Sequence, residues 1–333
     1  MGVYSTNSGA ASFDGFTPQG GTLTQNTSEG LCGISFSHGS EARPSGPNLS
    51  DGEHGQSYSL SDAAPLLAEE LSLNLKRDIQ AVSIRQMLKS DYAQALRLFD
   101  RCYDLYAKAF PDANEIESPE DLLRFLKRES RQWDIIAVVE GDRVLGARHM
   151  TLLHSDHPEI GAFAVGEHVY VDQSERKRGI AKSLIAHTED LMRSWGVKLA
   201  LSEQNDPNVM SPELLELEAQ SGITTRQRVS FWKNRGYEGV DAPYLQPPLG
   251  EGKRAVHHLR VAIRRLDPGV PDSLPTEGYI QMLKAYQSGW VRDIEVDPLV
   301  HDYCEAIRQE HPHRVPIIDL EQVRTCVKLK KEA

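Results

Sequence analysis

The chain has 333 residues and a formal net charge of −11 at pH 7. A net acidic chain argues against binding to nucleic-acid phosphates, which requires a basic surface that displaces counterions. No run reaches the roughly 20 apolar residues of a membrane-spanning helix, and the N-terminus lacks the basic and apolar regions of a secretory signal. We therefore expect a cytoplasmic protein that neither binds nucleic acid nor spans a membrane.

The four cysteines support the same expectation. They are Cys32, Cys102, Cys304 and Cys326. Because they are widely separated and form no C-x-x-C pair, they fit neither a disulfide framework nor a zinc site. A reduced, intracellular protein is expected.

Most of the negative charge lies in the first 75 residues, where eight acidic residues against Arg43 alone give −7 and leave −4 for residues 76–333. This segment is rich in Gly, Ser and Thr and shows no sustained period of 2 or 3.6. Such a composition offers too little apolar surface to offset the entropy of ordering. We predict a disordered acidic arm over residues 1–75, within which residues 60–75 either form an amphipathic helix or dock on the body.

The start of the arm leaves a second localisation open. Residues 1–6 match the formal pattern for N-myristoylation, but the match arises readily by chance and a plain disordered start is favoured. The composition of the arm also resembles the export segments of bacterial effectors. An exported effector is therefore the alternative to a cytoplasmic protein.

Periodic patterns begin at Arg77. Alternating and helical spacings predict strands at 79–84, 133–139, 144–153, 163–171, 197–203, 237–245 and 255–266. Helices are predicted at 91–110, from 119, at 180–195, 211–220, 226–234, 276–288 and 298–310. Ser118 is the expected N-cap of the second helix and Pro119 its first residue.

The turn after the strand ending at Val171 is the most informative segment. It contains Arg176-Lys177-Arg178-Gly179 and opens directly into a helix. Free N–H groups at a helix N-terminus bind anions, and the basic side chains add positive charge. The pattern is neither a Walker A loop nor a G-x-G-x-x-G motif. It predicts an anion site of another kind, with a solvated basic loop as the alternative.

The order of the elements, with the pattern Arg176-x-x-Gly179-x-Ala181 after the fourth strand, resembles the GCN5-related N-acetyltransferase (GNAT) superfamily. The run from Phe231 to Tyr237 is similar to the end of that family's fourth helix. The resemblance covers residues 77–266. It implies an α/β fold with a mixed, largely antiparallel sheet, splayed between strands 4 and 5 and flanked by helices. We expect an acyltransferase domain at 76–267 and a helical C-terminal extension at 268–333 that packs on it.

The resemblance also implies where acetyl-coenzyme A binds. Its pyrophosphate would lie on the backbone amides of Arg178, Gly179, Ile180 and Ala181, with Arg176 or Lys177 in support. Main-chain groups of Val169, Tyr170 and Val171 would bind the pantetheine arm. Acetyl-coenzyme A is then a donor substrate, and no metal is expected.

Two carboxylates are candidate bases, because an attacking amine must lose a proton. Glu167 lies twelve residues before the motif glycine, where some family members place a catalytic side chain. Strand alternation predicts that Glu167 shares a face with Val169 and Val171 and that His168, a structural histidine, points away. Glu203, across the expected cleft, is the second candidate, as a base or as an ammonium-binding carboxylate. A solvated or ion-paired carboxylate is the alternative for both.

The sequence departs from the family pattern at Trp232, because many members carry a tyrosine there that protonates the leaving thiolate. Indole has no titratable hydroxyl. Tyr237, Tyr170 or water then replaces it, or the thiolate leaves without a side-chain acid, or transfer is impaired. The long segment 205–225 is either a wall of the substrate site or packing.

Other motifs are given structural interpretations. The run Gly250-Glu251-Gly252 is predicted to be a hairpin turn, and Cys304 a core residue. His257 and His258 lack the spacing and acidic neighbours of a metal site.

The sequence as a whole predicts an acyl-CoA-dependent N-acyltransferase that transfers acetyl to a primary amine of a small molecule. An N-acyl amino acid-type synthase with a longer acyl donor, or a non-catalytic coenzyme A-binding module, is the alternative. The oligomeric state is not predicted.

Overall fold

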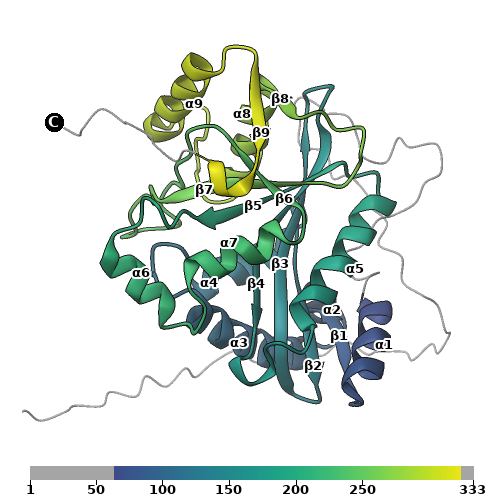
Figure 1. The fold of residues 1–333 in the computed structure, drawn as a ribbon. Helices are drawn as coiled ribbons and strands as arrows, with labels where there is room; N and C mark the ends of the chain where they lie inside the picture. Colours follow the sequence, from purple (N-terminus) through teal and green to yellow (C-terminus); the bar gives the residue numbers. More distant parts are fainter. Residues whose placement is uncertain (1–63, 324–333) are drawn as a thin grey trace, which may run out of the picture.

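The computed structural model describes residues 64–323, which form one sheet flanked by helices (Figure 1). Within these residues the strand order is β1-β2-β3-β4-β5-β7-β6-β9-β8. The strands are β1 (Gln80–Ser83), β2 (Gln132–Glu140), β3 (Arg143–Ser155), β4 (Gly161–Val171), β5 (Leu199–Asn205), β6 (Tyr237–Val240), β7 (Leu259–Arg265), β8 (Ser273–Pro275) and β9 (Arg314–Ile318). Among the described residues no helix is long and apolar enough to cross a membrane.

The sheet is antiparallel except between β4 and β5, which run parallel. These two strands pair only where residues 163–165 lie beside residues 199–201. Beyond that point β4 continues to Val171 and β5 to Asn205, and the two strands no longer pair with each other. The mixed, largely antiparallel sheet that opens between its fourth and fifth strands is therefore confirmed.

Helices cover both faces of the sheet (Figure 1). They are α1 (Ala64–Leu75), α2 (Ile84–Ser90), α3 (Tyr92–Ala109), α4 (Pro119–Lys127), α5 (Ile180–Ser194), α6 (Pro212–Ala219), α7 (Thr225–Lys233), α8 (Thr276–Gln287) and α9 (Pro298–Glu310). The core shared by α1 and α5 contains Ala164 of β4. Its strand neighbours Phe163 and Val165 belong to the core under α8 and α9, so these two helices lie on the opposite face.

Local sequence signals determine where most helices begin. Ser118 and Ser211 accept hydrogen bonds from the first turns of α4 and α6, and Thr224 forms a capping box at α7. Asp91 ends α2 and caps the N-terminus of α3. The structure therefore has two successive helices here, of which the sequence predicted only the second. The predicted helices at 276–288 and 298–310 are confirmed as α8 and α9.

Helix α1 lies within the segment predicted to be a disordered arm. Leu67 and Leu71 are fully buried against the sheet and α5. Glu70 accepts a hydrogen bond from Ser183 and contacts His187, both on α5. Residues 64–75 are therefore a packed helix, one of the two possibilities left open for them, while residues 1–63 lie outside the described part.

The C-terminal extension differs from the expectation of a purely helical segment. It also supplies β8 and β9, and β9 pairs with β6 at Gly239 and Val240. The strand predicted at 237–245 is shorter than expected and ends at Val240. Strands of three and five residues are too short to leave a clear period-2 pattern.

Candidate active site

A cleft of about 690 Å³ opens where β4 and β5 separate. Residues 167–171 of β4 line one wall and residues 202–205 of β5 line the other. The N-terminus of α5 closes one end, and α7 with the loop before it closes a side. Main-chain groups of β4 that face this gap have no partner strand there, so they are available to a ligand.

A β-bulge shapes the β4 wall. On β3, Met150 pairs with Gly166 and the preceding residue His149 pairs with His168, so Glu167 is the extra residue. Both His168 and Glu167 consequently point to the face that contains Trp133. The prediction that Glu167 shares a face with Val169 and Val171, opposite His168, is therefore wrong: those valines contact the α5 core, and the bulge breaks the alternation.

Glu167 is buried yet lines the cleft. Its Oε2 accepts a hydrogen bond from Nε1 of Trp133, and its buried Oε1 has no partner among the described residues. Burial, and then the neighbouring Glu117 carboxylate, raise the pKa of Glu167 to about 8. This carboxylate is therefore held in place with one oxygen free.

Glu203 is half-buried on the opposite wall. Its Oε1 accepts a hydrogen bond from Tyr244, and its Oε2 accepts one from Tyr286 at 3.0 Å. Burial raises the pKa of Glu203 to about 7, although the two tyrosine hydrogen bonds lower it. Glu167 and Glu203 thus present two carboxylates with raised pKa values to one cleft.

A third carboxylate lies behind these two. Glu117 is buried and accepts a hydrogen bond from the hydroxyl of Tyr106 at 2.6 Å, and that hydroxyl lies 3.0 Å from Nε2 of His168. Burial raises the pKa of Glu117 and lowers the pKa of His168 to about 3. His168 is therefore a neutral, hydrogen-bonded side chain at the cleft wall.

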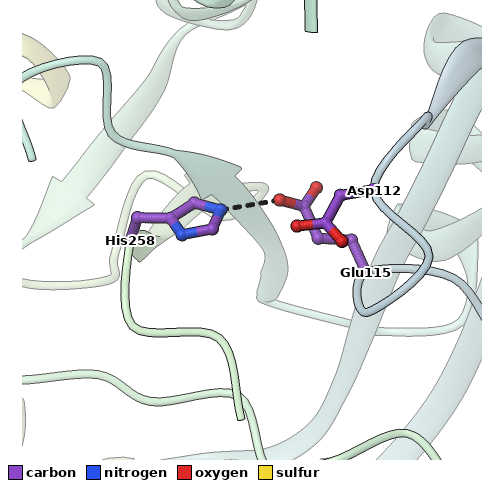
Figure 2. A group of neighbouring side chains, drawn as sticks. All are labelled: Asp112, Glu115 and His258. Carbon is purple, nitrogen blue, oxygen red and sulfur yellow. Dashed lines mark hydrogen bonds and ion pairs between the residues drawn. The ribbon is translucent and has the colours of Figure 1, made fainter. Parts of the chain in front are cut away.

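The rim near β7 contains a histidine and two acidic residues (Figure 2). Nε2 of His258 lies 2.7 Å from Oε1 of Glu115, and Asn205 donates to the other oxygen of Glu115 at 3.1 Å. Asp112 lies beside them, and the three residues offer ligand atoms within 4.8 Å of one another. The expectation that His258 lacks acidic neighbours is therefore wrong. Because Glu115 already has protein partners on both oxygens, we interpret this group as a hydrogen-bonded cluster rather than a metal site.

The N-terminus of α5 forms the other end of the cleft. Gly179 has φ of 89° and leaves the first amides of the helix without a side-chain cap, and Ile180 and Ala181 line the cleft beside it. Lys177 also lines the cleft. Arg176 lines the cleft as well, and its guanidinium donates to the carbonyl of Ser221 at 2.7 Å.

Arg178 was expected to hold the pyrophosphate, but it does not line the cleft, and its guanidinium lies 3.3 Å from the buried carboxylate of Glu175. Glu175 also forms ion pairs with Arg77 and Arg143, so it holds the turn before α5 in place. A further cation, Lys182, lines the cleft. The turn therefore combines free amides with Lys177 and Lys182 at the positive end of a helix, which suits an anionic ligand.

Segment 205–225 contributes to the wall of the cleft. Its residues Gly222 and Ile223 line the cleft, as do Arg228 and Trp232 of α7. The carboxylate of the buried Glu218 lies 3.3 Å from Arg228. The segment is therefore a wall of the site, one of its two predicted interpretations.

Neither tyrosine named by the sequence brings a free hydroxyl to the cleft. Tyr237 is buried against Trp232, with ring centroids 4.7 Å apart, and is not a lining residue. Burial raises the pKa of Tyr237 to about 12. Tyr170 lines the cleft, but its hydroxyl lies 2.9 Å from Nε2 of the buried His149.

Sequence reasoning missed several residues of the site. Glu115 and Glu117 lie in the loop between α3 and α4, and Tyr244 and Tyr286 come from segments 41 and 83 residues after Glu203. The acidic run Glu115-Ile116-Glu117 is the one local signal in the sequence for these site residues. It lies in a loop, between Pro111 and the helix cap Ser118.

The fold and the cleft define an α/β protein that places the uncapped N-terminus of a helix at one end of a cleft and a group of carboxylates along its walls. The family model described as "Acetyltransferase (GNAT) family" matches residues 99–216. This match confirms the resemblance to the GNAT superfamily over residues 99–216.

Solved structures with similar folds include several acetyltransferases. An aminoglycoside acetyltransferase, meta-AAC0020, from an uncultured soil metagenomic sample is 16% identical over 47% of this chain and 84% of its own, with a TM-score of 0.33. The ribosomal-protein-S18-alanine N-acetyltransferase of Escherichia coli is 11% identical over 51% and 88%, with a TM-score of 0.34. An aminoglycoside 6'-N-acetyltransferase complexed with coenzyme A is 17% identical over 52% and 93%, with a TM-score of 0.35. No curated protein matches the chain.

Proposed function

We propose that the protein transfers an acetyl group from acetyl-coenzyme A to a primary amine of a small molecule. One observation carries this proposal: Glu167 and Glu203 face the same cleft, and neither has an ion-pair partner within residues 64–323. Buried carboxylates without a cation are costly unless a ligand supplies one. An ammonium group of the acceptor would fill that role.

The other end of the cleft fits the donor. An added Cβ at Gly179 would meet nothing within 4 Å, so an anion has open access to the amides at the start of α5. Lys177 and Lys182 lie beside this end, and the unpaired edge of β4 leads from it toward Glu167. The pyrophosphate and pantetheine of coenzyme A would be held by these groups in that order.

The two carboxylates divide the work on the acceptor. Glu203 binds the ammonium group, and Glu167 takes the proton through its free Oε1. Bases with pKa values of about 7 and about 8 suit this task, because they are partly ionised at neutral pH and still accept a proton. The donor supplies a thioester carbonyl. The amine nitrogen bonds to its carbon, the carbon–sulfur bond breaks, and the thiolate takes up a proton.

Water is the proposed source of the thiolate proton. Trp232 carries no titratable hydroxyl, and Tyr237 is buried behind Trp232 and does not line the cleft. The hydroxyl of Tyr170 is hydrogen-bonded to His149. Transfer without a side-chain acid therefore fits these positions better than the tyrosine substitutes considered from the sequence.

Mass spectrometry of a panel of small amines after incubation with acetyl-coenzyme A tests the proposal. We expect a gain of one acetyl group on primary amines and no reaction of the matching alcohols. Parallel incubations with long-chain acyl donors test the alternative of an N-acyl amino acid-type synthase. Binding of coenzyme A without turnover of any amine would instead favour a non-catalytic module.

A further inference from the structure

The carboxylate of Glu203 accepts hydrogen bonds from two tyrosine hydroxyls on the side away from the cleft. Tyr244 donates to Oε1 and Tyr286 donates to Oε2 at 3.0 Å, while the amide of Gln246 lies 3.4 Å from Oε2. Tyr244 and Tyr286 are at most 3% exposed and do not line the cleft, whereas Glu203 does. The tyrosines therefore lie on the protein side of Glu203 and leave its other side to the cleft.

These tyrosines come from outside the region that matches the family model, which ends at residue 216. Tyr286 is on α8, in the C-terminal extension, and Tyr244 is in the segment between β6 and β7. A second layer holds them: the fully buried Gln287 donates to the carbonyl of Leu245 at 3.1 Å and accepts a hydrogen bond from Tyr303 on α9. The extension thus reaches the cleft through a connected hydrogen-bond network.

The remaining titratable groups near Glu203 oppose its ionisation. Glu115 and Glu117 from the α3–α4 loop raise its pKa, and the carboxylate of Glu167 on β4 interacts with it. Tyr279 on α8 is also close, but burial raises the pKa of its hydroxyl, so it stays neutral and adds no charge. No cation within 4 Å of Glu203 is present in the described residues. The two phenol donors are therefore the main groups that favour a charged carboxylate at this position, with the amide of Gln246 as a longer contact at 3.4 Å.

We propose that the C-terminal extension completes the acceptor site, with Tyr286 and Tyr244 as positioning residues that orient Glu203 and keep it ionised to bind an ammonium group. A hydroxyl can donate only one proton, so both donors are committed to the carboxylate. The free lone pairs of the carboxylate then point to the cleft. The identity of the acceptor as an amine rests on the proposed function, but the hydrogen bonds from Tyr244 and Tyr286 to Glu203 do not.

The direct test is the pKa of Glu203 itself, measured by carbon-13 NMR of the labelled glutamate carboxyls in the full chain. The signal is assigned by its loss in Glu203→Gln. In Tyr286→Phe we expect the midpoint to rise by about one pH unit, because a hydrogen bond to a charged group is lost. Tyr279→Phe is the matched control: it removes a hydroxyl from the same helix that has no hydrogen-bond partner among the described residues.

An unchanged midpoint in Tyr286→Phe would overturn the proposal, whether or not the protein transfers acetyl groups. Tyr244→Phe carries the same expectation and replaces the first variant if that one does not fold. In the acetylation assay, both variants should raise the KM for the amine about tenfold, with kcat changed less than threefold and the KM for acetyl-coenzyme A unchanged. Equal losses in both KM values would point to general damage and also count against the proposal.

Discussion

Nε1 of Trp133 donates a hydrogen bond to Oε2 of Glu167, across the intervening strand β3. Trp133 is 1% exposed, so the packed indole has little freedom to move. Oε1 of the same carboxylate is buried and has no hydrogen-bond partner among the described residues, while Glu167 as a residue lines the cleft. A carboxylate that is anchored at one oxygen and free at the other is well placed to accept a proton.

Glu167→Gln should therefore lower kcat about a hundredfold or more, since the amide cannot take up the proton of the amine. The Kd for coenzyme A should stay within about twofold, because the donor is held at the other end of the cleft. Steady-state kinetics and calorimetric titration measure the two quantities separately.

Glu238→Gln is the matched control for this change. Glu238 lies on β6, where it pairs with Arg265 at 2.7 Å, and it does not line the cleft. Its replacement should leave kcat unchanged. Turnover near the normal rate in Glu167→Gln would rule out Glu167 as the base.

The raised pKa of Glu167 also predicts how the stability of the fold depends on pH. Its ordinary value is 4.5 and burial raises it to about 8, so between these values the folded protein holds a proton that the unfolded chain releases. The contribution of this group to the free energy of unfolding therefore falls as pH rises through that window. Glu167→Gln should gain stability relative to the parent protein between pH 5 and pH 8. Urea denaturation at both pH values measures this, and a constant difference would contradict the assigned pKa.

Signals within a few residues were read correctly from the sequence. Ser118 and Pro119 start α4 as expected, and Gly179 stands at the N-cap of α5. Both depend on chemistry that is local to a helix end. The fold class could be predicted because those local elements follow one another in a distinctive order.

The site could be predicted only in part, because its geometry depends on pairing between distant segments. The bulge that turns Glu167 toward Trp133 is a property of the β3–β4 register, and its one sign in the sequence of β4 is Gly166, because a glycine inside a strand suggests a bulge without fixing its place. The contact between Glu203 and Tyr286 joins residues 83 positions apart. Periodicity identifies which strand carries a carboxylate, but it does not identify the partners that set its pKa.

Lys177→Ala should weaken the binding of coenzyme A. Lys177 is exposed at the cleft end formed by α5, so it contributes charge rather than packing. The loss of one exposed charge near a phosphate is worth up to about 1 kcal/mol, which corresponds to a roughly fivefold rise in Kd at low salt. Lys198→Ala, at an exposed position outside the cleft, is the control. The effect should shrink as salt is added, and a salt-independent loss would speak against a phosphate contact.

Trp232→Phe and Tyr237→Phe test the assignment of the thiolate proton to water. Neither residue is expected to act as an acid, so each variant should keep kcat within about threefold of the parent. Tyr237→Phe removes a buried hydroxyl that lies away from the cleft lining. A loss of a hundredfold in Tyr237→Phe, with an altered basic limb of the pH profile, would restore Tyr237 as the acid.

Helix α1 should contribute measurably to the stability of the fold. Leu71 is fully buried against the sheet, whereas Leu73 on the same helix is 73% exposed. Leu71→Ala removes buried methyl groups and leaves a cavity, so the free energy of unfolding should fall by about 2 to 5 kcal/mol. Leu73→Ala, the same substitution two residues away, should change it by less than about 0.5 kcal/mol. Denaturant titration of the two variants measures the difference. Equal, small effects would mean that α1 is not docked in solution and that the arm predicted from the sequence extends to residue 75.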